Sequence, residues 1–232
     1  MRTISVISYV LQLFLLVCMT ACEDVNSKHQ KYLDAGETQY IGKVDSVEVW
    51  GGKEKAKFTW QINTDPRIVS TIIYWNNRND MEEVPVNRIQ PGVMNMEAII
   101  NVAERAAVNF ELVTMDEDGN YSIPVLKSTQ IYGPNYISQL DNRKMSAVFD
   151  GNSLTINWGI VESSSVQYTT VRYTDYSDTS NPTDKSVRVE NDDNQTLIEG
   201  VRGGDKLNIV TTYMPSGCFE MLDALPSEQT IF

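Results

Sequence analysis

Side chains that could carry out acid–base or nucleophilic chemistry are few in this chain of 232 residues. Its single histidine is His29, which lies near the N-terminus, before the segments that read as folded domains. A Ser-His-Asp or Cys-His catalytic arrangement needs an imidazole, and so does a zinc site built on histidine. We therefore expect no such site in the domains, and we interpret His29 as a solvated residue of a tether.

Cys22 ends a segment with the pattern of a bacterial lipoprotein signal. Arg2 supplies a positive charge, an apolar run extends over residues 4–19, and Thr20-Ala21 precedes Cys22. A basic start, an apolar stretch and small residues before a cleavage point are typical of secretory signals. We expect acylation of the Cys22 thiol and attachment to the outer membrane. An ordinary signal peptide and a structural helix are the alternatives, since a transmembrane helix needs about 20 apolar residues.

Cys218 would be the only cysteine of the mature domains, because Cys18 leaves with the signal and Cys22 takes the lipid. No intramolecular disulfide could then form, so the domains must be stabilised by their cores alone. A lone cysteine can be a reactive thiol or a link between chains. More often it packs as a small apolar residue, which is our interpretation.

The acidic segment 116–120, with the sequence Asp-Glu-Asp-Gly-Asn, looks at first like a calcium loop. An EF-hand counted from Asp116 needs Gly at its sixth position and Glu at its twelfth, where this chain has Tyr121 and Lys127. Asp, Gly and Asn tolerate positive φ angles, so a turn between two strands explains the segment. We expect no metal and no cofactor, with weak calcium binding by loop carboxylates as the alternative.

Four tyrosines are candidates for ligand binding: Tyr74, Tyr121, Tyr132 and Tyr136. A sugar ring can stack on a flat aromatic face while Asn and Asp side chains bind its hydroxyl groups. Tyr74 alternates with apolar neighbours on a predicted strand, so it should point away from the core. The alternative for Tyr132 and Tyr136 is packing at a joint between two domains.

The elements that would position these residues are predicted to be strands. Residues 56–62 and 154–160 alternate apolar and polar side chains, which predicts one buried and one solvated face. Turn residues separate the strand segments, for example at 51–52, 63–66, 150–152, 203–204 and 215–217. Short strands at regular intervals, without a long helical period, are typical of a sandwich or a barrel.

Apolar positions recur at a spacing of 98 residues, which indicates an internal duplication. The first strand pair matches Ala56, Phe58, Trp60 and Ile62 with Leu154, Ile156, Trp158 and Ile160. The next strand matches Ile73 and Trp75 with Val171 and Tyr173 at the same spacing, and a later one matches residues 108–112 with 207–211, one residue further along. A repeat of this size on core positions predicts two copies of one domain, with Trp60 and Trp158 buried and the boundary near residues 132–135.

Each copy has room for about seven strands in about 95 residues, the size of an immunoglobulin-like sandwich. An inward Trp on the second strand and aromatic residues on the third, without a disulfide, resemble the fibronectin type III subclass. The predicted fold is all-β. A lipoprotein signal (1–21) precedes a lipidated Cys22 with a flexible tether (22–40). Two tandem fibronectin type III or immunoglobulin-like antiparallel β-sandwiches follow, at 41–132 and 133–232.

Four segments resemble a Bacteroidetes lipoprotein family known as domain of unknown function 4998: residues 36–44, 72–76, 116–122 and 131–136. They cover the first predicted domain and the junction well, and the second domain poorly. The resemblance implies a lipoprotein on the surface or in the periplasm of a Gram-negative cell. It implies no activity and no catalytic residues.

The charge of the chain excludes one class of partner. The formal net charge is −12, and removal of residues 1–21 takes away only Arg2, which leaves −12 − 1 = −13. Such a surface repels phosphates, so we expect no nucleic-acid partner. It also keeps the protein soluble.

We therefore expect a non-catalytic lipoprotein that binds a glycan or a protein at the cell surface. The membrane, through the lipid anchor, and a polysaccharide or an envelope protein are the expected partners. One alternative is a structural spacer or a subunit of an envelope assembly. Another is a glycoside hydrolase, since two carboxylates at a set separation are enough for that chemistry, although small sandwiches lack the deep cleft that catalysis needs.

Overall fold

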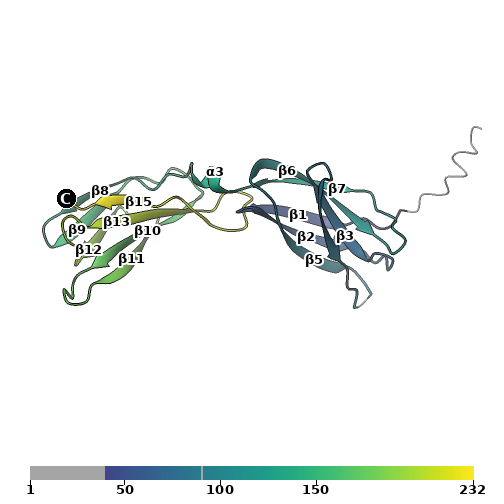
Figure 1. The fold of residues 1–232 in the computed structure, drawn as a ribbon, viewed down its shortest axis with the longest axis horizontal. Coiled ribbons are helices and arrows are strands. Elements are labelled where there is room, and N and C mark those ends of the chain that lie inside the picture. Colours follow the sequence, from purple (N-terminus) through teal and green to yellow (C-terminus); the bar gives the residue numbers. More distant parts are fainter. Residues whose placement is uncertain (1–39, 90) are drawn as a thin grey trace, which may run out of the picture. The chain divides into compact units, whose positions relative to one another are not determined.

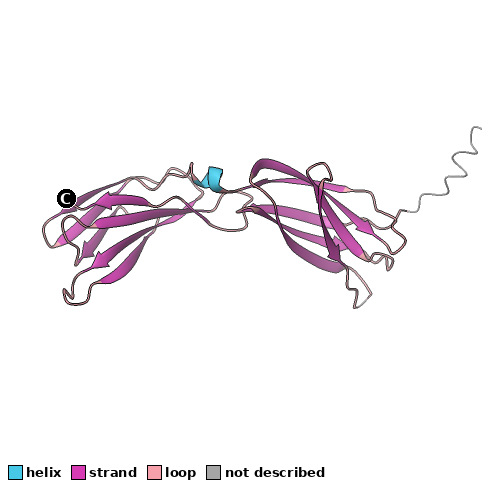
Figure 2. Cartoon of the chain, in the orientation of Figure 1, coloured by secondary structure: helices cyan, strands magenta, loops and turns pink. Residues whose placement is uncertain are grey.

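The computed structural model describes residues 40–89 and 91–232 (Figure 1). The predicted signal, His29, Cys22 and the predicted tether up to residue 39 lie outside the described residues. Residues 41–232 form one unit. Its strands form four antiparallel sheets, and a short helix, α3 (Pro134–Ile137), follows β7 in the chain (Figure 2). Within this part of the chain, no helix has both the length and the apolar character that crossing a membrane requires.

The first sandwich packs a three-stranded sheet against a four-stranded sheet. The smaller sheet has the order β1-β2-β5, with β1 at Asp45–Gly52, β2 at Lys55–Ile62 and β5 at Met94–Asn101. The larger sheet has the order β4-β3-β6-β7, with β3 at Ser70–Trp75, β4 at Asp80–Pro85, β6 at Arg105–Met115 and β7 at Val125–Ile131.

The second sandwich repeats this arrangement. Its smaller sheet has the order β12-β9-β8, with β8 at Met145–Phe149, β9 at Ser153–Trp158 and β12 at Gln195–Glu199. Its larger sheet has the order β11-β10-β13-β14, and β15 also pairs with β13. The bounds of these strands are β10 Val166–Asp175, β11 Thr183–Val189, β13 Lys206–Tyr213, β14 Leu222–Asp223 and β15 Ser227–Thr230.

The alternating apolar side chains of β2 form much of the first core. Ala56, Phe58, Trp60 and Ile62 are each at most 1% exposed, because successive side chains of a strand point to opposite faces. Phe58 meets Phe110 of the opposite sheet edge to face, with ring centroids 4.9 Å apart. The indole N–H of Trp60 donates a hydrogen bond of 3.2 Å to Thr71 Oγ1, so the one polar atom of this side chain is satisfied inside the core.

A second, separate core lies in the other sandwich. It is built around Leu154, Ile156 and Trp158 of β9 and around Val171 and Ile209 of the facing sheet. The indole N–H of Trp158 donates to Thr196 Oγ1 at 2.9 Å, as Trp60 does to Thr71. The predicted fold class is thus confirmed: the chain folds as two tandem fibronectin type III-like β-sandwiches, each with its own core.

A buried acidic residue makes the second sandwich sensitive to pH. Asp175, at the end of β10, is 6% exposed. Its carboxylate pairs with the Lys185 ammonium and accepts a hydrogen bond of 2.6 Å from Ser177 Oγ. The bond to Lys185, followed by the bonds to Ser177, lowers the pKa of Asp175 to about 2.

We expect the second sandwich to lose stability as the pH falls from about 4, the pKa of Asp175 in the unfolded chain, to about 2. A group whose pKa is lower in the folded state stabilises the protein above its unfolded pKa, and protonation removes that contribution. Urea unfolding at several pH values, followed in the second sandwich, measures the loss. An Asp175→Asn variant should show a shallower dependence over this range, and an equal slope in both proteins would contradict the assignment.

Candidate functional site

The outer face of the larger sheet in the first sandwich carries a half-buried aromatic residue, Tyr74. On β3, Ile73 points into the core, and Tyr74 lies half-buried on the opposite face, as the alternation predicts. Tyr74 is paired with Met81 of β4 and with Glu111 of β6. The outer face of β3 is therefore the place where this tyrosine can meet a ligand.

The structure brings a second predicted tyrosine to the same place. Tyr121 forms an isolated bridge with Met115 at the end of β6 and is 45% exposed. Partial burial, followed by the nearby phenol of Tyr121, raises the pKa of Tyr74. The two phenol groups, 47 positions apart in the chain, are therefore neighbours on the surface.

An arginine from the β3–β4 turn covers part of Tyr74. Asn76, Asn77 and Arg78 have φ angles of 51°, 55° and 62°, a left-handed conformation that costs an arginine about 1–2 kcal/mol. The turn directs Arg78 back over the sheet, where its guanidinium lies 5.1 Å from the Tyr74 ring centroid. Its Nη2 and Nε donate to Glu111 Oε2 at 2.6 and 2.8 Å, which holds the strained turn in place.

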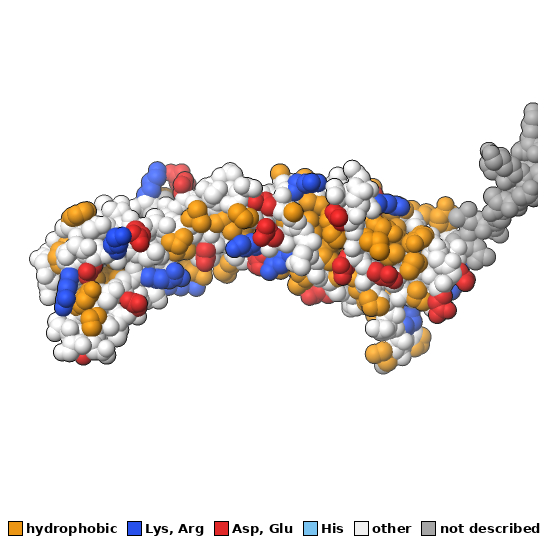
Figure 3. All heavy atoms as spheres, viewed as in Figure 1, with side chains coloured by type: hydrophobic (Ala, Val, Ile, Leu, Met, Phe, Trp, Pro, Cys, Tyr) orange, Lys and Arg blue, Asp and Glu red, His pale blue; other side chains and the backbone are white. Residues whose placement is uncertain are grey.

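We call this surface the tyrosine face. Its members are Tyr74, Tyr121, Arg78, Glu111, Met81 and Leu126. Ile72 and Val113 lie on the same side of the sheet but are buried, each 3% exposed. Met81 is 55% and Leu126 67% exposed, so apolar area remains in contact with water. Figure 3 shows hydrophobic side chains gathered on the first sandwich, with acidic and basic side chains among them. An exposed patch of this kind with a polar rim is typical of interaction sites.

The second sandwich does not repeat this surface. Because Ile73 pairs with Leu112 and Val171 pairs with Ile209, the counterpart of Tyr74 is Arg172. The counterpart of Ile72 is Thr170 by the same register. A tyrosine earlier on β10, Tyr168, lies under the Arg188 guanidinium, 3.8 Å from the ring centroid. The fold thus does not require the tyrosine face.

Tyr132 and Tyr136 lie at the junction of the two sandwiches. Their rings pack edge to face with centroids 4.7 Å apart, and they join Cys218 and Leu222 in a small apolar cluster. The Tyr132 hydroxyl donates to the Ser216 carbonyl at 3.1 Å. Tyr132 is 3% exposed, so it offers no face for stacking, and this corrects its selection as a ligand-binding candidate. Tyr136 is half-buried in the same cluster.

The acidic segment 116–120 and Cys218 are each held by contacts within the fold. Asp116 Oδ1 accepts hydrogen bonds from the backbone N–H groups of Asp118 and Asn120 at 3.1 and 2.8 Å, the pattern of a turn. Cys218 is 6% exposed, and its burial raises the pKa of its thiol. Among the described residues, no group of three or more His, Cys, Asp or Glu side chains is placed to hold a metal ion.

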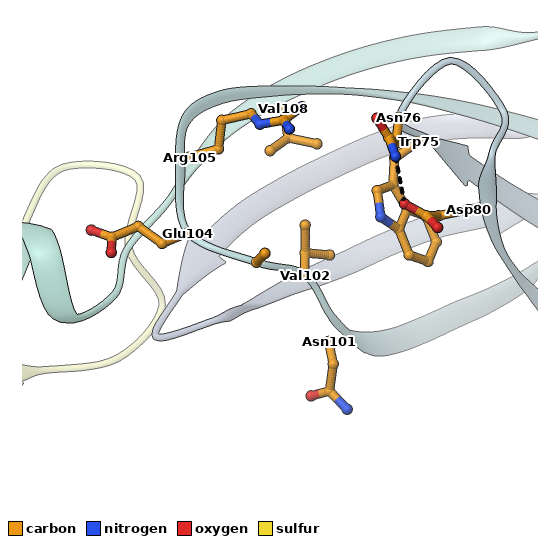
Figure 4. Close-up of a pocket in the computed structure, with 9 residues that line it drawn as sticks. Trp75, Asn76, Asp80, Asn101, Val102, Glu104, Arg105 and Val108 are labelled. Carbon is orange, nitrogen blue, oxygen red and sulfur yellow. Dashed lines mark hydrogen bonds between the residues drawn. The ribbon is translucent and has the colours of Figure 1, made fainter.

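The sequence reasoning missed a cavity beside Trp75. This residue points inward as predicted, but it is only half-buried, and it lines a cavity of about 340 Å³ at the end of the first sandwich (Figure 4). The opposite wall comes from the segment that connects β5 to β6. That segment is irregular, so no periodic signal in the sequence points to it.

Comparisons with known proteins give one family match and similar solved structures. The profile of DUF4998, described as a domain of unknown function, matches residues 22–219, so the match extends well into the second sandwich. The two-domain fibronectin type III segment of chicken tenascin is similar at 14% identity, over 82% of this chain and 99% of that chain, with a TM-score of 0.33. The FN1–FN3 domains of chicken CNTN1 are similar at 14% identity, over 84% of this chain and 69% of that chain, with a TM-score of 0.37. No curated protein matches the chain.

Proposed function

The chain belongs to the family described as a domain of unknown function, DUF4998, and we propose that it is a non-catalytic lipoprotein of the cell envelope that binds a glycan through its tyrosine face. The sequence around Cys22 supports the anchor, and the family match begins at the same residue. Acylation of Cys22 would place the sandwiches on the periplasmic or outer side of the outer membrane. Two or more acyl chains give stable anchoring.

The observation that carries this proposal is the pair Tyr74 and Tyr121. Both rings are kept outside the core at partial exposure, and aromatic rings of this kind bring large contact area with few rotatable bonds. Tyrosine and arginine are also the residues most enriched at binding hot spots. Because the duplicated sandwich has Arg172 in place of Tyr74, the pair reflects a role that only the first copy has.

The polar rim favours a glycan over an apolar partner. The phenols both donate and accept hydrogen bonds, the Arg78 guanidinium only donates, and the Glu111 carboxylate only accepts. Arg78 and Glu111 are already paired with each other. Sugar hydroxyl groups donate and accept, so they can bond to the phenols and to the remaining donors and acceptors of this ion pair, which an apolar partner would leave unsatisfied. Stacking on the rings would hold the less polar face of the sugar.

A non-catalytic role is supported by how the carboxylates are used. Asp80 and Glu104 both line the cavity beside Trp75. Glu104, however, accepts hydrogen bonds from the backbone N–H groups of Asn135 and Tyr136 at 2.8 and 2.6 Å. A hydrolase of the two-carboxylate type needs both groups free to face the scissile bond. Glu104 instead connects the first sandwich to α3.

The junction supports the second candidate function, a structural spacer. The Gly51 N–H donates to the Gly217 carbonyl at 3.0 Å, and the Phe219 N–H donates to the Gly51 carbonyl at 3.0 Å. Lys55 and Glu220 form an ion pair at 2.8 Å across the same junction. Such a joint would fix the second sandwich to the first, as a spacer requires. It involves none of the residues of the tyrosine face, so the two functions are compatible.

We expect the chain to be retarded in affinity gels containing one of a panel of starch, xylan, galactomannan, pectin and mucin. Tyr74→Ala or Tyr121→Ala should weaken retention about five- to tenfold each, the effect of losing one hot-spot contact of more than about 1 kcal/mol. Arg172→Ala, the matched position in the second sandwich, should leave it unchanged. Retention on none of the glycans, or equal losses in the three variants, would overturn the proposal.

A further inference from the structure

A second candidate site lies at the same end of β3 as Tyr74 but on the core side of the strand, where Trp75 points toward the segment that connects β5 to β6. Its cavity of about 340 Å³ is lined by Trp75, Asn76, Asp80, Asn101, Val102 and Arg105, among others. Figure 4 shows Trp75 and Asp80 on one side and Arg105 on the other, with Val102 between them. Ligand pockets begin at about 300 Å³, so this volume fits a small molecule or one unit of a polymer.

The indole of Trp75 forms a fixed wall of this cavity. It packs against Phe110 with ring centroids 6.3 Å apart and planes tilted by 53°, which attaches it to the core. Val102 and Val108, 6% and 4% exposed, complete the apolar part of the lining. A ring held in this way loses little conformational freedom when a ligand stacks on it, which favours binding.

The polar part of the lining offers hydrogen-bond donors and acceptors together. Asn76 Nδ2 donates to Asp80 Oδ2 at 3.1 Å, which orients the carboxylate. Asn101 and Arg105 are exposed at the same cavity. An amide donates and accepts, a carboxylate accepts and a guanidinium donates, so this set matches hydroxyl groups, which need partners of both kinds.

The second sandwich has a cavity of about 420 Å³ that involves the counterpart of Trp75, Tyr173. Two lysines that line it already have partners: Lys185 pairs with Asp175, and Lys206 with Glu228 at 2.6 Å. In addition, Thr174 Oγ1 donates to Asp184 at 3.0 Å. Four polar side chains of this cavity are therefore already paired within the second sandwich, whereas the buried Oδ1 of Asn208 has no hydrogen-bond partner among the described residues.

We infer that the Trp75 cavity is a binding site for a single pyranose unit of a neutral saccharide, with the indole as the stacking wall and Asp80, Asn101 and Arg105 as hydroxyl partners. The glycan class is shared with the proposed function, but the site is separate from the tyrosine face. A ligand of this size in a half-open cavity should bind with a dissociation constant in the millimolar range.

The test is an NMR titration of the detergent-solubilised full chain labelled with ¹⁵N-tryptophan, which has four indole signals. The probes are the methyl glycosides of glucose, galactose, mannose and N-acetylglucosamine, with glucuronic acid as an acidic comparison. We expect at least one neutral sugar to shift the Trp75 indole signal saturably. The signals of Trp60 and Trp158, whose N–H groups are hydrogen-bonded inside the cores, should stay in place.

Trp75→Phe assigns the signal, and Asn101→Ala and Arg105→Ala test the exposed rim without entering the core. Each rim variant should weaken binding about five- to tenfold, the effect of one lost hydrogen bond, and Arg172→Ala should not. A Trp75 signal that none of the neutral sugars moves, or that only glucuronic acid moves, would overturn the inference. If gel retention through Tyr74 nevertheless persists, the proposed function stands without this site.

Discussion

Replacing Trp60 by alanine is expected to lower the free energy of unfolding of the first sandwich by about 3–5 kcal/mol, the range for large-to-small changes in a packed core. Trp60 is 1% exposed, so the cavity left behind has no solvent to fill it. The change also leaves the hydroxyl group of Thr71, which is 0% exposed, without the indole N–H that it accepts from. The second sandwich has its own core and should stay folded.

Hydrogen exchange followed by mass spectrometry separates the two sandwiches in one experiment. In Trp60→Ala, protection should fall by a factor of about 10² to 10⁴ in peptides from residues 41–131 and stay unchanged in peptides from residues 145–231. The duplication provides the matched variant, Trp158→Ala, for which the pattern should be reversed. Equal losses in both halves from either variant would show that the cores unfold as one unit.

Replacing Gly51 by alanine is expected to open the junction. A Cβ at this position would lie 1.8 Å from the backbone carbonyl oxygen of Gln130, and backbone atoms cannot rotate away. Relief requires β1 to move, and β1 also holds the 215–220 loop through the two hydrogen bonds of Gly51. Overpacking of this kind costs about 1–3 kcal/mol. Cys218, which pairs with Gly51 in an isolated bridge, should then become accessible.

Thiol labelling measures this opening. With Cys18 and Cys22 replaced by serine, Cys218 is the only thiol of a chain with three cysteines. Its burial and raised pKa predict slow labelling at neutral pH. Gly51→Ala should accelerate the reaction about 10- to 100-fold. Gly119→Ala is the control, because that turn glycine has open space around it and a φ of +80°. Equal acceleration in both variants would contradict the role of Gly51.

The fold was predictable because its signals are local. The period-two alternation of residues 56–62 and 154–160 predicts β2 and β9, and the spacing between them predicts the duplication. The end of the second segment differs, because β9 ends at Trp158, and Ile160, the predicted counterpart of Ile62, is 90% exposed. Trp60 and Trp158 were recognised as core residues because their neighbours at i ± 2 are apolar. The outward direction of Tyr74 follows from the same rule, because successive side chains of a strand point to opposite faces of the sheet.

The candidate sites depend on contacts that no local pattern encodes. The meeting of Tyr74 with Tyr121 depends on the register of β3 with β6 and on the turn after Met115. The cover over Tyr74 depends on three consecutive positive φ angles, one of them at an arginine, a residue that rarely adopts them. The Trp75 cavity depends on the irregular 101–105 segment, and the burial of Tyr132 on a loop 84 positions away.

In the proposed function, the first sandwich binds a glycan on its tyrosine face and the second sandwich does not. The most direct test is a map of NMR chemical-shift changes over the chain upon addition of oligosaccharides of the glycan that retards it in gels. Binding on the tyrosine face should change the signals of β3, of β6 and of residues around Tyr121, and leave those of β10 and β13 unchanged. Changes confined to the second sandwich, or spread equally over both copies, would contradict it.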